Sequence, residues 1–311
     1  MEQFRTELPI TPAPLIDHRS RIVTTGSCFS DNIGQKLSEN KFPVVVNPLG
    51  TCYNPISIHK GLLMSKPDDS LFVESEGAWR HYDFHSKFFG NTKEELNARL
   101  IEQLKPRDAD VIIITYGTSW VYKHKATGKI VANCHKRPQS EFEKVLLDVD
   151  DILTSFRELH NILKSKLIIT LSPVRHIKDT LELNSVSKSI LRTAIHEIQK
   201  TFTGVDYFPA YEIMVDDLRD YRFYGQDMIH PSDVAIDYIW QKFGERYFSD
   251  QTKKLNDRWQ KTFRSINHRA FNEKSKQHIE FLKSLLKELE ELNASIDVSS
   301  EIATIQGRIN A

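Results

Sequence analysis

The chain has 311 residues, with 42 basic and 42 acidic side chains and a formal net charge of zero. This length is enough for one large domain or two small ones with a buried core. The balanced charge gives no electrostatic sign of a nucleic acid or an anionic membrane as a partner. The hydrophobic fraction of 40% and the aromatic fraction of 10% are those of a soluble globular protein rather than a disordered chain.

No window approaches the roughly 18 unbroken apolar residues of a membrane span. The N-terminal stretch "MEQFRTELPITPAPL" lacks the basic region and apolar core of a secretory signal, so we expect a cytoplasmic protein. The three cysteines, Cys28, Cys52 and Cys134, are an odd number at wide spacing. This pattern predicts reduced thiols rather than a disulfide framework.

In chain order, short apolar runs alternate with longer amphipathic ones. The runs rich in Val and Ile predict buried parallel strands over residues 21–25, 43–46, 111–116 and 167–171. The amphipathic patterns predict helices over 31–40, 141–164, 186–201 and 232–246. This alternation predicts an α/β fold of three layers, with a parallel sheet covered by helices on both faces.

Two segments do not follow this alternation. Residues of about 50 to 108 are too long for a simple crossover and predict a helical excursion that walls a pocket. In it, His81, Asp83 and His85 alternate along an extended run, which fits either a surface strand or a second wall of a site.

Beyond Phe248 the chain is charged and helical. We therefore expect an α/β domain over 1–248 and a helical C-terminal extension over 249–311. The extension carries apolar residues at 3-4-3 spacing, which favours docking on the domain and leaves a homo-oligomer through this helix as the alternative; they are Ile279, Leu282, Leu286 and Leu289.

Chemically informative residues follow the predicted strands. Open α/β sheets bind ligands at the carboxyl ends of their strands. The first strand is followed by Gly26, Ser27 and Cys28, where either Ser27 or Cys28 fits a nucleophile at a helix N-terminus. Near the end of the chain, Asp227 precedes His230 by three residues, a spacing that lets the carboxylate hold the imidazole Nδ1–H and leave Nε2 as a base.

Four spaced motifs of the sequence resemble the GSCFA family, which is grouped by resemblance with the SGNH (GDSL-like) hydrolases. They are "TTGSCFSDNIG", "ANCHKRP", "SPVRHIKD" and "DYRFYGQDMIHPS", and the likeness runs from about Thr24 to Phe243. "GSCFS" stands where SGNH enzymes carry Gly-Asp-Ser-Leu-Ser, and "DMIHPS" is similar to their terminal Asp-x-x-His block. The resemblance implies an SGNH-hydrolase-like, flavodoxin-like fold and ester hydrolysis or acyl transfer.

By this register, Cys28 takes the place of the SGNH serine and Ser27 that of the aspartate. The resemblance also places Gly50 near an oxyanion-hole glycine and Gly117 at the glycine of the Gly-x-Asn-Asp block. Ser119, however, stands where the asparagine is expected. Loss of one such amide donor costs on the order of a hundredfold or more in rate. Asn133 or Ser119 itself are the candidates to replace it.

Each candidate also has a simpler interpretation. Cys28 also fits a buried small hydrophobe, Ser27 a helix cap, and His230 a polar residue ahead of a proline. Asn133 and His135 fit either a pocket rim that contacts substrate or an ordinary loop.

Arg175 and His176 follow the fourth strand and fit either the binding of an anionic substrate group or a structural ion pair. We expect no cofactor and no metal, because the cysteines and histidines lack the close spacing of a zinc site. A metal-dependent hydrolase is therefore the weakest alternative.

The sequence thus predicts an SGNH-like esterase or acyl transferase on a polar, carbohydrate-type acyl ester. Its catalytic group would be Cys28 or Ser27 with His230 and Asp227. The rival hypothesis is a catalytically silent protein that binds a glycan or a small metabolite on the same fold.

Overall fold

The computed structural model describes residues 6–104, 108–268 and 275–310. The chain divides into two compact units. Unit 1 comprises Met1–Pro9, Arg21–Gln35 and Val44–Gln241, and unit 2 comprises Ile10–Ser20, Lys36–Pro43 and Lys242–Ala311. The predicted boundary between residues 248 and 249 stays a prediction.

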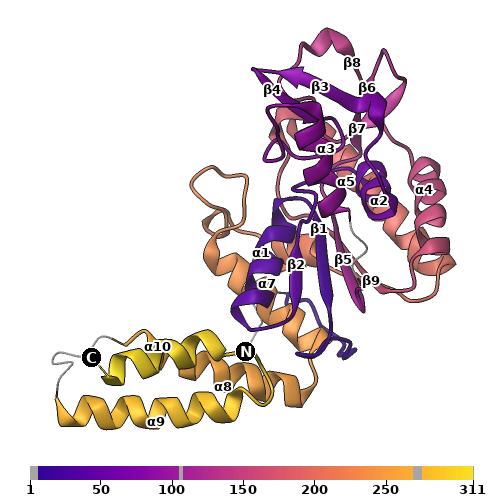
Figure 1. Ribbon diagram of the computed structural model, residues 1–311. Helices are drawn as coiled ribbons and strands as arrows, with labels where there is room; N and C mark the ends of the chain where they lie inside the picture. Colours follow the sequence, from indigo (N-terminus) through magenta and orange to yellow (C-terminus); the bar gives the residue numbers. More distant parts are fainter. Residues whose placement is uncertain (1–5, 105–107, 269–274, 311) are drawn as a thin grey trace. The chain divides into compact units, whose positions relative to one another are not determined.

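A five-stranded parallel sheet forms the centre of unit 1 (Figure 1). Its strands in spatial order are β10 (Val205–Phe208), β9 (Lys166–Leu171), β5 (Val111–Tyr116), β1 (Ile22–Gly26) and β2 (Val44–Val46). Numbered by their place in the chain, the strands run 2-1-3-4-5, which is the flavodoxin-like order. The predicted three-layer α/β fold is confirmed, and the four predicted strands are all present.

Helices cover both faces of this sheet (Figure 1). On one face, α2 (Pro55–Leu63), α4 (Val149–Ile162) and α5 (Leu181–Thr201) share a core cluster with β1, β5 and β9. On the other lie α1 (Cys28–Glu39) and α7 (Asp233–Tyr247). Burial of apolar surface on both faces explains why the strands read as continuous Val- and Ile-rich runs.

Two further segments of unit 1 carry small antiparallel sheets, and we call residues 69–103 and 120–146 together the cap. The first contains η1 (Asp69–Leu71), the hairpin β3 (Phe72–Ser75) and β4 (Ala78–His81), and α3 (Lys93–Gln103). The second contains β6 (Trp120–His124), β7 (Lys129–Val131), η2 (Gln139–Glu141) and β8 (Phe142–Leu146), in the order β7-β6-β8. The two segments pack together through Leu71, Tyr82, Val131 and Phe142.

The cap corrects two predictions. The excursion predicted as helical contains a hairpin, and the helix predicted from residue 141 begins only at Val149, after β8. Asp148 caps that helix by accepting the N–H of Asp151 at 2.8 Å. Pairing of β8 with β6 along five residue pairs outweighs the local helical period, because strand formation depends on partners distant in the chain.

Shorter elements of unit 1 join the main ones. They are η3 (Ile177–Asp179), α6 (Ala210–Glu212), the π-helix η4 (Ile213–Leu218) and η5 (Tyr221–Phe223). Of these, η3 follows β9, and η5 precedes the loop that carries Asp227 and His230.

Unit 2 contains α8 (Asp250–Ile266), α9 (Lys276–Leu292) and α10 (Ser299–Asn310). Leu282, Leu285, Leu289 and Leu292 of α9 are buried in a cluster with Trp259 of α8 and Ile305 of α10. Most of the apolar stripe predicted for docking or pairing is therefore used inside this unit, and the homo-oligomer stays a prediction.

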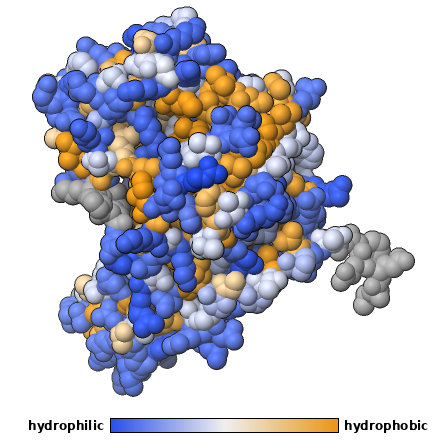
Figure 2. All heavy atoms as spheres, turned by 90° about the vertical axis from the view of Figure 1, so that its right-hand side faces the viewer, coloured by the Kyte–Doolittle hydropathy of each residue, from blue (hydrophilic) through white to orange (hydrophobic). Residues whose placement is uncertain are grey.

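The surface mixes apolar and hydrophilic side chains, with the apolar ones gathered in the upper part of the face shown in Figure 2. Among the helices of the described residues, none has the length and hydropathy needed to cross a membrane.

Candidate active site

The turn between β1 and α1 places Ser27 and Cys28 at the carboxyl edge of the sheet. Gly26 makes this turn possible, because its φ is +133° and a Cβ there would lie 2.2 Å from the carbonyl oxygen of Thr115. The N–H of Ser27 donates to that same oxygen at 3.1 Å. Cys28 is the first residue of α1, so its thiol lies at the positive end of a 12-residue helix.

The environment of Cys28 has opposing effects on its thiol. Burial, followed by the negative charge of Asp31, raises the pKa of the Cys28 thiol. The backbone N–H groups of Cys28 and Phe29 and the positive charge of Lys188 lower it. The net direction is upward, so the thiol form is favoured in the absence of substrate.

Ser27 is fully buried, and its Oγ has no hydrogen-bond partner among the described residues. It precedes α1 directly, but its side chain does not cap the helix. Ser27 lies against Gly117, since a Cβ on Gly117 would lie 3.3 Å from that of Ser27. Of the two candidate nucleophiles, only Cys28 is both partly exposed and close to charged groups.

A second loop, after β2, is fastened to this turn by Asn47. Its Oδ1 accepts the N–H of Gly26 at 2.9 Å, and its Nδ2 donates to Oδ1 of Asp31 at 2.6 Å. The sequence analysis missed Asn47. Its φ is positive, at 39°, and asparagine adopts such angles more readily than most residues. An asparagine directly after a strand was therefore the available sign of a turn at this position.

Gly50 closes the same loop with a φ of +81°, and a Cβ there would lie 2.2 Å from Cβ of His85 in the cap. The N–H of Gly50 donates to the carbonyl of Asn47 at 2.8 Å. This corrects the expectation of a free oxyanion donor at Gly50, because a tight turn already uses its N–H.

Asp227 and His230 form a compact pair on the loop before α7. Nδ1 of His230 lies 2.6 Å from Oδ2 of Asp227, while Oδ1 accepts the backbone N–H groups of Ile229 and His230 at 2.9 and 3.0 Å. These bonds lower the pKa of Asp227 to about 2, the bond from the His230 ring contributing most. Asp227 is therefore ionised near neutral pH and fixes the His230 ring through Nδ1, so that Nε2 takes no part in this contact. Both side chains are about half exposed.

Arg175 holds this loop in place. Its Nη1 donates to the carbonyl of Met228 at 3.0 Å, and its N–H donates to the carbonyl of Ile229 at 3.2 Å. Its guanidinium also stacks over the rings of Tyr221 and Tyr224, 5.6 and 5.4 Å from their centroids. The structure thus gives Arg175 a positioning contact that neither predicted interpretation included.

The ring of His176 lies against Gly117, at the end of β5. A Cβ on Gly117 would lie 3.2 Å from its Nε2, and its ring meets that of Tyr53 edge to face at 5.5 Å. Burial, helped by the charges of Lys188 and His230, lowers the pKa of His176 to about 4. A neutral ring does not supply the cation expected for binding an anion. Its Nε2 is buried and has no partner in the described part of the chain.

The Gly117–Ser119 segment faces inward. The N–H of Gly117 donates to the carbonyl of Tyr53 at 2.8 Å. Ser119 is fully buried. Its N–H donates to Oγ of Ser187 at 2.8 Å, and its Oγ donates to the carbonyl of Ser187 at 3.4 Å. Ser119 is therefore tied to α5 and cannot replace the missing asparagine as an oxyanion donor.

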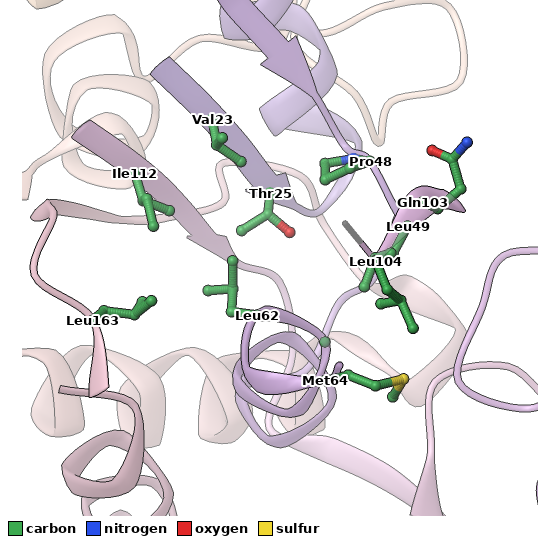
Figure 3. A pocket seen from close by; sticks show the side chains of 11 residues that line it. Val23, Thr25, Pro48, Leu49, Leu62, Met64, Gln103, Leu104, Ile112 and Leu163 are labelled. Atoms are coloured by element: carbon green, nitrogen blue, oxygen red, sulfur yellow. The ribbon is translucent and has the colours of Figure 1, made fainter. Parts of the chain in front are cut away.

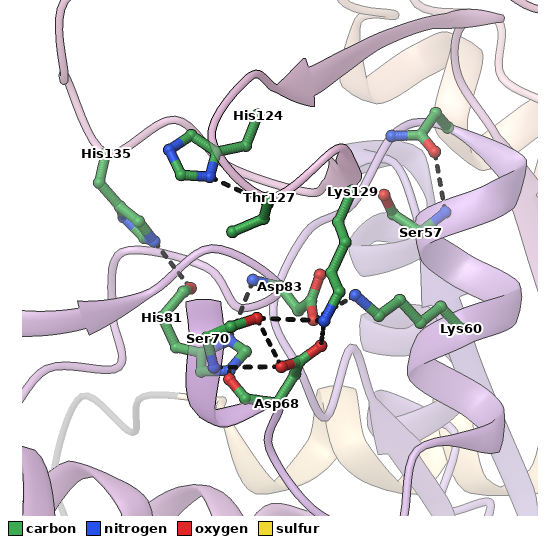
Figure 4. A network of polar contacts seen from close by, with 11 residues as sticks. Ser57, Lys60, Asp68, Ser70, His81, Asp83, His124, Thr127, Lys129 and His135 are labelled. Atoms are coloured by element: carbon green, nitrogen blue, oxygen red, sulfur yellow. Dashed lines mark hydrogen bonds and ion pairs between the residues drawn. The ribbon is translucent and has the colours of Figure 1, made fainter. Parts of the chain in front are cut away.

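His135 is buried in the cap (Figure 4), and Asn133 is half-buried close to it in the chain. His135 donates from Nε2 to the carbonyl of His81 at 2.8 Å, and Asn133 accepts the N–H of His135 at 2.8 Å and donates to Ser86 at 3.2 Å. These bonds tie both side chains to the structure of the cap, and none of them joins Cys28 or His230.

His81 ends β4, is fully buried and donates to the carbonyl of Asp68 at 2.9 Å (Figure 4). Asp83 pairs with Lys60 at 2.6 Å, also in the interior. Asp83 and His85 lie beyond the strand, so the predicted surface strand is wrong for this run. The network holds the cap together and contains no candidate catalytic residue.

A small apolar cavity of about 110 Å³ lies between the sheet and α2 (Figure 3). Its lining includes Val23, Thr25, Leu62 and Ile112. Neither Cys28 nor His230 is among the lining residues, so the cavity is separate from the candidate catalytic groups. No cluster of three or more His, Cys, Asp or Glu side chains suited to a metal occurs in residues 6–104, 108–268 and 275–310.

Lys188 is a site residue that the sequence analysis missed. Its ammonium is buried, with hydrogen bonds to the carbonyls of Gly117 and Ser172 at 2.8 and 2.7 Å, and its charge acts on the Cys28 thiol. The sequence contained one sign that Lys188 is buried. Lys188 lies at 3-4-3 spacing with Leu191, Ile195 and Ile198, on the apolar face of α5.

Comparisons with solved structures give distant likenesses. An acetylxylan esterase from Geobacillus stearothermophilus has 11% identity and a TM-score of 0.42, over 76% of this chain and 97% of that chain. A carbohydrate esterase family 2 enzyme from Corynascus thermopiles has 13% identity and a TM-score of 0.38, over 76% and 67%. These scores are too low for any activity to be transferred to this chain.

A search of the curated proteins finds no match. Two family descriptions do match the sequence. The C-terminal domain of GSCFA domain proteins matches residues 259–311. The GSCFA family matches residues 21–243, which contain the whole sheet and all the candidate catalytic groups described above. The chain therefore belongs to the GSCFA family.

Proposed function

We propose that this protein is an esterase-type hydrolase or acyl transferase in which Cys28 is the nucleophile, His230 the base and Asp227 the residue that orients His230. The observation that carries the proposal is the 2.6 Å contact of His230 with an ionised Asp227, on a loop at the same sheet edge as Cys28. A base held by a carboxylate beside a nucleophile at a helix N-terminus suits acyl transfer.

In the proposed reaction, Nε2 of His230 takes the thiol proton and Sγ of Cys28 forms a bond with the ester carbonyl carbon. The carbonyl oxygen becomes an oxyanion, for which the N–H of Cys28 at the start of α1 is a donor. The intermediate then expels the alcohol, which takes the proton from His230. Water, or an acceptor alcohol in a transferase, attacks the thioester, gives its proton to His230 and releases the acyl product as the thiol is restored.

An ester of a polar, carbohydrate-type alcohol is the proposed substrate. Two polar side chains, Tyr53 and Asp31, interact electrostatically with Cys28, and the hydroxyl of Thr51 donates to Asp31 at 3.4 Å. Such groups suit a substrate with several hydroxyls better than a purely apolar ester.

The test compares Cys28→Ala with Cys52→Ala and Cys134→Ala on 4-nitrophenyl acetate and a panel of acetylated sugars. The proposal expects turnover to be lost only in Cys28→Ala. It also expects iodoacetamide to label Cys28 before the other thiols, because burial raises the pKa of Cys52 to about 12 and that of Cys134 to about 11. Full turnover by Cys28→Ala would overturn the thiol mechanism.

A silent binding protein is the second candidate, and one observation favours it. No hydrogen bond joins Cys28 to His230 in the part of the chain that the structure describes. The double variant Cys28→Ala, His230→Ala separates the two functions. Unchanged binding of an acetylated sugar by this variant, with no turnover by the wild-type chain, would establish the binding protein.

A further inference from the structure

Lys188 lies on α5 at the carboxyl ends of two central strands. The carbonyls that its Nζ binds, those of Gly117 and Ser172, follow β5 and β9 directly. Only 3% of Lys188 is exposed. A lysine is almost never buried to this degree unless its charge is paired.

Its described hydrogen-bond partners are neutral. Two carbonyl oxygens take two of the three ammonium hydrogens, and no carboxylate pairs with Lys188 in the described residues. The titratable groups that face it are the Cys28 thiol at the start of α1, the His176 ring and the Tyr211 ring, whose centroid is 5.8 Å from Nζ. Because an uncompensated buried charge is costly, Lys188 keeps its proton more readily when an anion forms on the Cys28 side.

We propose that Lys188 supplies the positive charge that stabilises the thiolate of Cys28. The inference rests on the assignment of Cys28 as the nucleophile. It gives α5 a defined part in the site. Ser187 fixes the Gly117–Ser119 segment, and Lys188, the next residue, places its ammonium on the carbonyl of Gly117, which packs against Ser27, the neighbour of Cys28.

The electrostatics agree with this role. Burial lowers the pKa of Lys188 to about 7, and negative charge at Cys28 raises it. Conversely, Lys188 lowers the pKa of the Cys28 thiol, while burial and the charge of Asp31 on α1 raise it. Formation of the thiolate and retention of the lysine proton therefore favour each other.

Two variants separate charge from hydrogen bonding. Lys188→Gln is neutral but still offers two N–H donors to the two carbonyls, whereas Lys188→Met offers none. Lys242→Met is the matched control, because Lys242 is also buried, at 5% exposure, and pairs with Glu245 at 3.3 Å in unit 2.

The measurement is the rate of alkylation of Cys28 by iodoacetamide between about pH 5 and 10, with each cysteine resolved by mass spectrometry. We expect both Lys188 variants to react about tenfold more slowly near pH 7, with the rate profile displaced to higher pH by about one unit. The control should follow the wild type. A Lys188→Gln profile that superimposes on the wild type, in a protein that melts cooperatively, would show that Lys188 only ties the strand ends.

A second pair of variants leaves Lys188 in place and applies if the Lys188 variants do not fold. Cys28→Asp puts a permanent anion at the head of α1, and Cys28→Asn is its neutral match. We expect Cys28→Asp to melt at the higher temperature at about pH 6 and this advantage to shrink at about pH 10, where Lys188 loses its proton. If the helix dipole alone stabilises the new carboxylate, the difference in melting temperature is the same at both pH values. That result would refute the inference.

These outcomes are distinguishable from those that test the proposed function. Slower alkylation in the Lys188 variants, with no esterase activity in any assay, would support the interaction of Lys188 with Cys28 and refute the proposed enzymatic function. Esterase activity that depends on Cys28, with an alkylation rate that does not change in the Lys188 variants, would support the enzymatic function and refute the role of Lys188.

Discussion

Oδ2 of Asp227 lies 2.6 Å from Nδ1 of His230, and the other oxygen of the same carboxylate accepts two backbone N–H groups of the His230 loop. One side chain therefore fixes both the ring and the backbone that carries it. Substitution of Asp227 by asparagine can separate these two roles. The amide keeps an oxygen that accepts the backbone N–H groups, but it lacks the negative charge that orients the ring.

Asp227→Asn is expected to lower kcat/KM by at least about a hundredfold, since the ring would lose the acceptor that fixes its tautomer. The fold should be unchanged because the asparagine oxygen still accepts the N–H groups of Ile229 and His230. Initial rates on 4-nitrophenyl acetate measure the effect. Asp233→Asn, at an exposed position on α7, is the control and should keep wild-type rates.

Arg175→Met tests the contact between Arg175 and the loop. Without the bond to the Met228 carbonyl, the loop is less well positioned, so kcat should fall about tenfold with KM little changed. Arg175→Lys should recover part of the loss, because it keeps one donor. A large rise in KM that is confined to anionic esters would instead indicate that Arg175 binds substrate.

Gly26→Ala tests the turn before Cys28. A Cβ 2.2 Å from a backbone oxygen has no room, so the free energy of unfolding should fall by about 3 kcal/mol or more. Gly128→Ala is the comparison, because Gly128 also has a positive φ, of 67°, but open space around it. It should cost about 1–2 kcal/mol in urea denaturation. Equal losses in the two variants would show that the backbone angle, and not the contact, makes Gly26 necessary.

Burial of His59 predicts a loss of stability in acid. Its ring is 1% exposed between Tyr116 and Ser155, and burial lowers its pKa to about 3. The folded protein thus resists a proton that the unfolded chain takes up at about pH 6.5. Stability is therefore complete above about pH 6.5 and falls as the pH drops toward 3.

Urea denaturation at about pH 7.5 and about pH 5 measures this loss. His59→Gln, which cannot take up a proton, should lose less stability between the two pH values than the wild type. His196→Gln replaces an exposed histidine on α5 and should lose as much as the wild type. An equal loss in all three proteins would refute the assignment to His59.

The fold was predictable where local pattern and burial agree. The four predicted strands are covered on both faces, which makes each a continuous apolar run. β10 was missed because its four residues include Asp206 and lie at the sheet edge, where burial is incomplete. β8 was predicted as helix because Phe142, Val145 and Leu146 also fit a helical period, and only its distant partner β6 decides the outcome.

The same distinction holds at the site. Asp227 and His230 were recognisable because they are three positions apart and their contact is local. Lys188 is 160 residues from Cys28 in the sequence, and only the packing of α5 against the strand ends brings its charge to the thiol. The contacts of Arg175 with Met228 are of this long-range kind too, 53 residues apart.

Ser119 limits how the site could be redesigned. It is fully buried and holds Ser187 through two bonds. An asparagine at this position would force a larger amide into filled space and break the bond with α5. The change Ser119→Asn therefore does not add an amide donor to the site. A new oxyanion donor would have to come from a position that is not already tied to α5.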